Sequence, residues 1–308
     1  MCTEARNFIE KIISDLDGAL SQNTLRAYRS DFMQLARWLE SKGLPIFPIT
    51  PEALVQYISE MQTRHKSATI RHRLETLRSI YFFAKLDDPT RAPEVRLALK
   101  RMHRAIGRHQ QQAYPLTRDH LDKMLKKCNS TIKGRRNELL LRIGYETMRR
   151  SSEICAFRFE NLKQLPDGRF ALFMPFSKTD QMGEGRLIPI SDLLAKRIQE
   201  WGKKIKADSG PILRSLRKGD RVSGPLGTHA ISIILVDLQY HARLRHLPYF
   251  SGHSFRVGAA LDLLNAGVPV EKIMLRAGWK RESTALRYLQ SWLDSVNPGE
   301  LNNTDEEF

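Results

Sequence analysis

The stretch from Ser251 to Gln290 concentrates residues whose types could act on a phosphate ester. His253 and Arg256 stand three residues apart, in an H-x-x-R spacing. Trp279 lies further along, and Tyr288 follows it after nine residues. A guanidinium group binds phosphate oxygens in a fork geometry, and a tyrosine hydroxyl can attack phosphorus. Helices that bring these four side chains together would form a site that binds a phosphate and attacks it.

Two groups upstream add charge to this set. Arg150 and Glu153 stand three residues apart in a helical pattern. Lys178 falls between two strand-like runs, 169–176 and 186–190, where a hairpin is expected to turn. Each residue alone has an ordinary explanation, such as a helical ion pair worth roughly tenths of a kcal/mol, a packed aromatic ring or an exposed lysine. Since H-x-x-R also occurs often by chance, only the combination is informative.

The order of these residues is far more specific than any one of them. It reads R-x-x-E-I, a hairpin Lys followed by Thr, G-H-S-x-R-x-G, G-W and then Tyr. This order resembles the tyrosine recombinase (phage integrase) family. The segments SGHSFRVGAALDLLNAGV and AGWKRESTALRYL are most similar to its Cre branch, including Trp where many relatives have His. The resemblance covers most of the chain, and near the N-terminus Thr24, Tyr28 and Phe32 carry it in a T-x-x-x-Y-x-x-x-F pattern.

The resemblance implies a role for each member of the set. The implied catalytic residues are Arg150, Glu153, Lys178, His253, Arg256, Trp279 and Tyr288. Arg150 and Arg256 would bind the phosphate, with Glu153 as a supporting acid. Trp279 would stand where relatives carry a second histidine. Tyr288 would attack the scissile phosphate to give a 3′-phosphotyrosyl intermediate and a free 5′-hydroxyl, before strand exchange through a Holliday junction.

These roles agree with the chemistry of the side chains. Two guanidinium groups can hold the charge that develops on the non-bridging oxygens without losing their protons. His253 could accept the tyrosine proton or bond the phosphate, and Lys178 could protonate the departing 5′ oxygen. Trp279 could donate its indole N–H. Because the phosphotyrosine keeps the energy of the broken bond, we expect no metal, ATP or other cofactor.

Composition favours a nucleic-acid partner. The chain of 308 residues has a formal net charge of +16 and a pI near 9.9, which favour a polyanion such as double-stranded DNA. Composition alone also fits a basic protein without such a partner. The three cysteines show no C-x-x-C spacing, the nine histidines show no metal-ligand spacing, and no run approaches a membrane span. We therefore expect a protein of the cytoplasm or nucleoid, without a zinc site or membrane contact.

The expected fold class is mainly α. Residues 1–109 are interpreted as a core-binding bundle of four or five helices, and 110–116 as a linker. Residues 117–308 are interpreted as a mixed α/β catalytic domain with one small antiparallel sheet and an acidic tail. Four arginines on basic helix faces of the bundle are candidate DNA contacts: Arg71, Arg78, Arg101 and Arg104. For each, a solvated basic face is the alternative.

Capping signals predict several helix boundaries. Asn23 or Thr24 is expected to cap a long helix, and Thr50 precedes a proline at the first position of the next. A further helix is expected from Pro93 to Ile106, and Ser191 is expected to cap another. These signals divide the chain into short helices joined by polar turns.

One helix of the second domain is a candidate base reader. Residues 214–227 are interpreted as a basic loop, and the helix that follows, from Thr228 to Arg243, corresponds to one that enters the major groove in the Cre branch. His229 and Ser232 fall where base-reading side chains would lie. Capping and packing compete with this interpretation, since the isoleucines within 231–234 are expected to face inward.

The resemblance also implies an assembly. It implies a C-shaped clamp around DNA and a homotetramer on two sites built from inverted repeats, with residues 291–296 in a helix of the kind that docks on a neighbouring subunit. The target sequence and any accessory proteins stay unknown. The alternatives are a type IB topoisomerase, a catalytically silent DNA-binding protein and a helix-turn-helix regulator. The helical bundle, the complete residue set and the motif order argue against these three in turn.

Overall fold

The chain divides into two compact units, which are described separately. In the computed structural model, residues 2–109, 112–175, 185–283, 285 and 286 are described. The first unit is Met1–Gln111 and the second is Gln112–Phe308. A helical first unit and a mixed second unit with a small antiparallel sheet agree with the fold class expected from the sequence.

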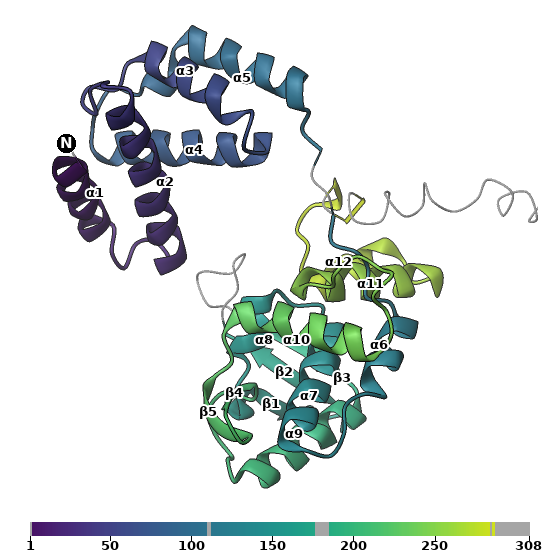
Figure 1. The fold of residues 1–308 in the computed structure, drawn as a ribbon. Helices are drawn as coiled ribbons and strands as arrows, with labels where there is room; N and C mark the ends of the chain where they lie inside the picture. Colours follow the sequence, from purple (N-terminus) through teal and green to yellow (C-terminus); the bar gives the residue numbers. More distant parts are fainter. Residues whose placement is uncertain (1, 110–111, 176–184, 284, 287–308) are drawn as a thin grey trace, which may run out of the picture. The chain divides into compact units, whose positions relative to one another are not determined.

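The described helices of the first unit (Figure 1) pack around a main apolar core, and a smaller cluster of Ile12, Leu16 and Leu25 lies between α1 and α2. They are α1 (Cys2–Asp15), α2 (Gln22–Ser41), α3 (Pro51–Met61), α4 (Ser67–Phe83) and α5 (Pro93–Ile106), with a 3₁₀ turn at Pro89–Arg91. The side chain of Ser21 accepts a hydrogen bond from the Thr24 amide and caps α2, so the expected cap at Asn23 or Thr24 was wrong by two or three residues. Thr50 caps α3 as predicted.

The second unit contains a three-stranded antiparallel sheet in the order β1-β2-β3 (Figure 1). Its strands are β1 (Leu162–Gln164), β2 (Phe170–Met174) and β3 (Arg186–Ile190). Leu172 of β2 pairs with Leu162 on one side and Ile188 on the other. Its described helices are α6 (Arg118–Leu125), α7 (Ile132–Thr147), α8 (Ser151–Ala156), α9 (Asp192–Ile205), α10 (Thr228–His241), α11 (Gly252–Asn265) and α12 (Val270–Ala277).

A second hairpin replaces the predicted basic loop at 214–227. Strands β4 (Arg214–Arg217) and β5 (Arg221–Pro225) pair antiparallel. Gly219 and Asp220, both at positive φ, make the tight turn between them. The prediction was wrong because these strands are short and basic, and they lack the apolar alternation by which a strand is recognised.

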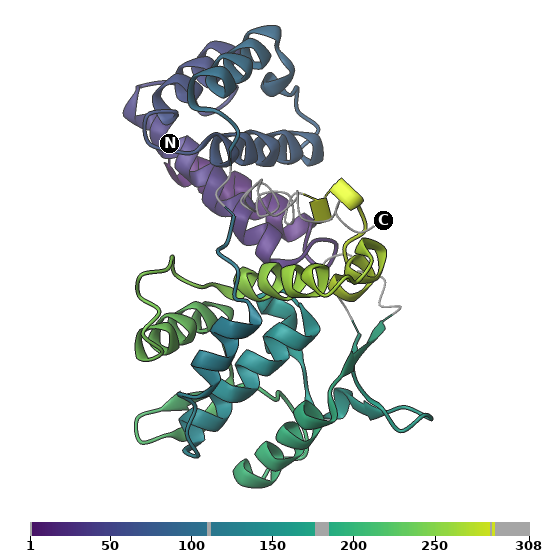
Figure 2. The ribbon, with the colours of Figure 1, turned by 90° about the vertical axis from the view of Figure 1, so that its right-hand side faces the viewer.

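Helix α7 forms the centre of the second unit and connects its two ends. Six consecutive residues, 136–141, are buried, because α9, α11 and the sheet all pack around this helix. Views from two sides place α11 and α12 at one end of the unit and α9 at the other (Figure 1, Figure 2). At Gly144, a Cβ atom would lie 2.6 Å from the ring of Phe255 on α11, so the two helices approach more closely than a side chain would allow.

Helix α11 is also held against the start of the second unit. The amide of Leu116 donates to the carbonyl of Ser254 at 3.0 Å. A Cβ atom on Gly258 would lie 1.9 Å from the Leu116 carbonyl oxygen and 2.7 Å from the amide nitrogen of Thr117. Both neighbours are backbone atoms and cannot rotate away.

Replacing Gly258 by alanine should therefore destabilise the second unit. We expect a loss of about 3 kcal/mol in the free energy of unfolding, at the upper end of what overpacking usually costs. Gly227→Ala is the matched control, because Gly227 has an ordinary φ of −74° and nothing within 4 Å of a Cβ atom. Urea denaturation measures both variants, and equal midpoints would contradict the close approach at Leu116.

Candidate functional site

Five of the seven residues in the predicted catalytic set lie in described segments: Arg150, Glu153, His253, Arg256 and Trp279. Lys178 and Tyr288 lie outside the described residues. The segment that contains Lys178 is flanked by β2 and β3, which pair with each other as the predicted hairpin requires.

The turn between α7 and α8 presents Arg150. Helix α7 ends at Met148, which adopts a left-handed conformation, and Arg150 is the N-cap of α8. The carboxylate of Glu153 accepts from the Arg150 backbone amide at 3.0 Å and from Arg150 Nη1 at 2.9 Å. Glu153 is buried, whereas 29% of the Arg150 side chain is exposed. The acid therefore fixes both the backbone and the guanidinium of Arg150 while solvent still reaches the cation.

The N-terminus of α11 lies against the N-terminus of α8. Ser251 caps α11 by accepting from the amide of His253 at 3.3 Å. A Cβ atom on Gly252 would lie only 2.0 Å from Oγ of Ser151, so the Ser151 side chain would have to move before a larger residue could stand at this contact between the two helix starts. This contact brings His253, at the start of α11, next to the turn that carries Arg150.

Arg256 and Trp279 meet on the inner side of α11. Arg256 is only 2% exposed, and its Nη2 donates to the carbonyl of Ala277 at 2.7 Å. Its guanidinium carbon lies 5.7 Å from the ring centroid of Trp279, which is within cation–π range. Gly278, with a φ of 67°, ends α12 and turns the chain so that Trp279 packs against Arg256.

Positive charge dominates the electrostatics of this site. Although His253 is exposed at the surface, partial desolvation by the surrounding protein lowers its pKa below the usual value, and the cations Arg256 and Arg150 lower it further. Burial also lowers the pKa of Arg149 to about 10, with Arg186 among the cations that contribute. His253 is therefore neutral at pH 7 and can accept a proton. A bound anion would relieve the repulsion among these arginines.

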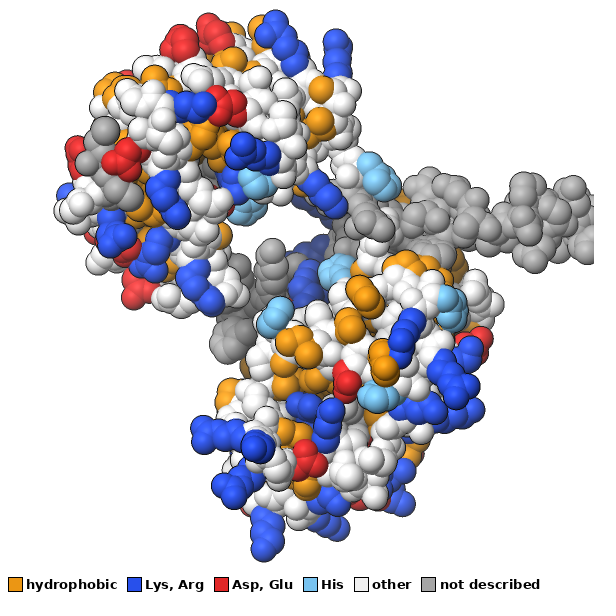
Figure 3. Space-filling model, in the orientation of Figure 1, with side chains coloured by type: hydrophobic (Ala, Val, Ile, Leu, Met, Phe, Trp, Pro, Cys, Tyr) orange, Lys and Arg blue, Asp and Glu red, His pale blue; other side chains and the backbone are white. Residues whose placement is uncertain are grey.

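The candidate DNA contacts lie in varied surroundings. Arg71, Arg101, Arg104 and His229 are exposed, and Ser232 is half-buried. Arg78 is engaged within the first unit, with its guanidinium 3.2 Å from Glu75 and 3.5 Å from Asp88. On the face of the molecule that Figure 3 shows, Lys and Arg side chains outnumber Asp and Glu side chains on both units.

One packing expectation for α10 was wrong. Ile231 and Ile234 are buried as expected, but 59% of Ile233 is exposed. The reason is helical geometry, because residues two apart in a helix lie on different faces. Ile233 therefore extends the exposed surface of α10 on which His229 lies.

Among the described residues, neither a metal site nor a membrane-spanning helix has support. They contain no group of three or more His, Cys, Asp or Glu side chains that could hold a metal ion. No helix among them is long and apolar enough to cross a membrane.

Sequence reasoning missed Arg149, which is 4% exposed and lies beside the set. Its Nε donates to the carbonyl of Thr147 at 3.0 Å, and its Nη2 donates to the carbonyl of Arg276. The pair of arginines at 149 and 150 was visible in the sequence. Every residue has a backbone carbonyl, so the sequence does not indicate which carbonyl accepts from Arg149.

Known recombinases are similar to this chain over most of its length. The chain is similar to the integrase/recombinase XerD homolog of Selenomonas ruminantium, with 26% identity over 287 residues that cover 89% of this chain and 83% of that protein. It is similar to recombinase Cre of Escherichia phage P1, with 26% identity over 297 residues that cover 90% and 86% of the two chains.

Solved structures show the same fold at low identity. A lambda integrase dimer (residues 75–356) bound to a COC′ core site matches with a TM-score of 0.63 and 17% identity, covering 92% of this chain and 94% of that one. A lambda integrase tetramer bound to a Holliday junction matches with a TM-score of 0.62 and 16% identity, covering 92% and 76%.

Two family models cover most of the sequence. The phage integrase N-terminal SAM-like domain matches residues 7–87, within the first unit. The phage integrase family model matches residues 115–292, a range that holds all seven residues of the predicted catalytic set. The chain therefore belongs to the phage integrase family.

Proposed function

We propose that this chain is a site-specific DNA recombinase that breaks and rejoins DNA through Tyr288. The observation that carries the proposal is the meeting of Arg150, His253, Arg256 and Trp279 from separate parts of the sequence. Family membership and the similarity to recombinases of the XerD and Cre types support the same activity.

In the proposed reaction, the same side chains act in strand cleavage and again in strand rejoining. The Tyr288 oxygen attacks the scissile phosphorus while His253, neutral at pH 7, accepts the phenolic proton or bonds the phosphate. The bond from phosphorus to the 5′ oxygen breaks, and Lys178 gives that oxygen a proton. Arg150 and Arg256 hold the non-bridging oxygens. A 5′-hydroxyl from a second strand then attacks the phosphotyrosine, releases Tyr288 and completes the exchange.

The proposed assembly is a homotetramer on two DNA sites that contain inverted repeats. Each subunit would clamp the DNA between its two domains. The reaction would take place in the cytoplasm. Similarity to the lambda integrase dimer on a core site and tetramer on a Holliday junction supports it. Arg71, Arg101, Arg104, His229 and Ser232 stay candidate DNA contacts. Among the six candidate DNA contacts predicted from the sequence, Arg78 is the weakest, because DNA would have to compete with Asp88 and Glu75 for its guanidinium group.

The alternatives explain fewer observations. A type IB topoisomerase would use the same chemistry, but the SAM-like domain matched at residues 7–87 is that of phage integrases. A catalytically silent DNA-binding protein would not need Glu153 to orient Arg150 or Trp279 to pack on Arg256.

Covalent trapping tests the nucleophile. The protein is incubated with nicked DNA duplexes that carry candidate inverted repeats from beside its gene, and with a panel of synthetic repeats. We expect a protease-sensitive protein–DNA adduct on a denaturing gel, and its loss in Tyr288→Phe. Tyr249→Phe is the control, since Tyr249 is an exposed tyrosine of the same unit and should keep the adduct. Retention of the adduct in Tyr288→Phe would move the chemistry to another residue.

The titration of His253 tests the electrostatics of the site. In the free protein, the His253 ring should titrate below pH 6.5, because partial desolvation and the two nearby arginines disfavour its charged form. Arg256→Gln and Arg150→Gln should each raise this pKa, since each removes a nearby positive charge. The midpoint is measured by NMR on the assigned imidazole. A midpoint above 6.5 in the wild type would contradict the cation-rich arrangement.

A further inference from the structure

Two arginine side chains, Arg149 and Arg276, join the C-terminal ends of α7 and α12, and a third, Arg256, ties α11 to the end of α12. Arg149 donates to the carbonyls of Thr147 and Arg276, Arg276 donates to the carbonyl of Glu146 at 2.9 Å, and Arg256 donates to the carbonyl of Ala277 at 2.7 Å. We call these three side chains and four carbonyls the arginine junction. Two of its carbonyls belong to the last turn of α7, and two belong to the last turn of α12.

Helix geometry explains why cations are found at this junction. The last four carbonyls of a helix have no partner within the helix, and they carry the negative end of its dipole. Two such ends brought together repel each other unless positive donors lie between them. Arg149 remains a cation at neutral pH, because its pKa of about 10 stays well above 7. Its guanidinium therefore bridges the two helix ends.

The junction also fixes the turn that carries Trp279. A Cβ atom on Gly278 would lie 2.7 Å from Nη1 of Arg149, so the guanidinium packs directly against this turn. Trp279 follows at once and packs on Arg256. On the other side, Arg149 is the residue before Arg150. The same side chain thus sets the spacing between the turn of Arg150 and the turn of Trp279.

We propose that Arg149 and Arg276 are positioning residues for strand cleavage. They hold the end of α12 on the turn between α7 and α8, and this keeps Arg150, Arg256 and Trp279 in register around one phosphate. The consequence for cleavage rests on the proposed function, whereas the effect on Trp279 does not. The rival explanation is that the junction only stabilises the fold.

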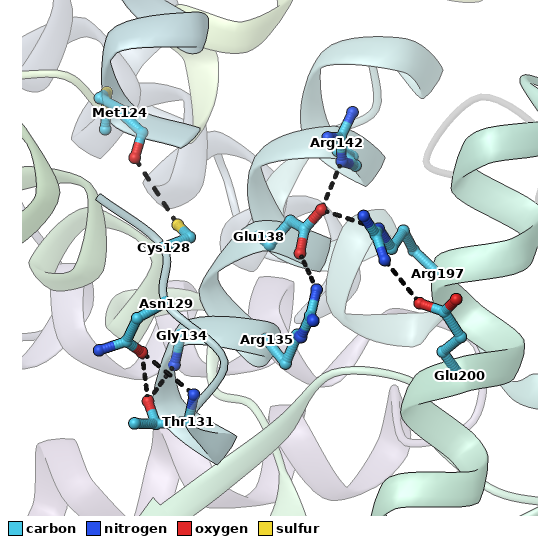
Figure 4. A network of polar contacts seen from close by, with 10 residues as sticks. All are labelled: Met124, Cys128, Asn129, Thr131, Gly134, Arg135, Glu138, Arg142, Arg197 and Glu200. Carbon is cyan, nitrogen blue, oxygen red and sulfur yellow. Dashed lines mark hydrogen bonds and ion pairs between the residues drawn. The ribbon is translucent and has the colours of Figure 1, made fainter. Parts of the chain in front are cut away.

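Arg149→Met and Arg276→Met remove the junction's bonds, and Arg197→Met is the matched control. Arg197 lies on α9 with Nε 3.1 Å from Glu138 and Nη1 2.7 Å from Glu200 (Figure 4). Glu138 also accepts from Arg135 and Arg142, so this control disrupts an ion-pair network of the same unit. Glu138 precedes Thr147 by nine residues, which is about 14 Å along α7 and away from the junction.

The first measurement is the rate of adduct formation on a nicked duplex at saturating DNA, well below the unfolding temperature of each variant. We expect Arg149→Met to cleave about 100-fold more slowly, a typical cost of misplaced reacting groups, with a DNA dissociation constant changed less than about 3-fold. Arg276→Lys should recover most of the rate lost in Arg276→Met, because one ammonium can still reach one carbonyl. Arg197→Met should lower the melting temperature and leave the rate unchanged. Equal rates in Arg149→Met and Arg197→Met would overturn the proposal.

The second measurement does not depend on catalysis. The indole N–H signals of ¹⁵N-labelled protein report on each tryptophan, and Trp279→Phe identifies the signal of Trp279. Arg149→Met should shift this signal and leave that of Trp201, near Arg197, in place. An unmoved Trp279 signal would overturn the proposal even in a protein that cleaves DNA. If the wild type forms no adduct on any duplex, the proposed function fails, and the indole signals still decide whether Arg149 positions Trp279.

Discussion

The site depends on holding several guanidinium groups close together before any anion arrives. Besides desolvation, the cations Arg150 and Arg256 lower the pKa values of both His253 and Arg149, because these side chains lie close together. Like charges at such distances separate unless negative partners hold them. The fold supplies those partners in two forms: the buried carboxylate of Glu153 on Arg150, and the carbonyl ends of α7 and α12 on the other arginines. Much of the second unit can be understood as the means of bringing these partners to one place.

Close helix contacts make that arrangement possible. Glycines at 144, 252 and 258 each stand where a methyl group would meet another element within 3 Å. Through them, α11 lies against α7, α8 and the start of the second unit at the same time. Because the N-terminus of α11 carries His253 and its next turn carries Arg256, these contacts fix two side chains of the proposed site to the turn of Arg150. The two glycines of the G-H-S-x-R-x-G motif thus act through packing, since both lie within α11 at ordinary helical backbone angles.

The sequence predicted what short-range patterns can encode. The bounds of α5 and the caps at Thr50 and Ser191 follow from residues adjacent to each helix. The pairing of Arg150 with Glu153 follows from a spacing of one helical turn. Features that depend on distant backbone were missed. The bond from Arg149 to the carbonyl of Arg276 joins residues 127 apart, and carbonyls are the same in every residue. The hairpin of β4 and β5 was missed because its strands lack apolar alternation.

The attachment of Leu116 to α11 has a mechanical consequence. Residues 112–115 form the start of the second unit, and the next residue, Leu116, makes a backbone hydrogen bond to Ser254. Ser254 lies between His253 and Arg256 in the sequence. Two residues later, the amide of Arg118 donates to Asp262 near the other end of α11, at 2.7 Å. Tension on this incoming segment is therefore carried both to α6, which begins at Arg118, and to α11, which carries His253 and Arg256. The close backbone contact at Gly258 leaves little room for α11 to shift relative to Leu116.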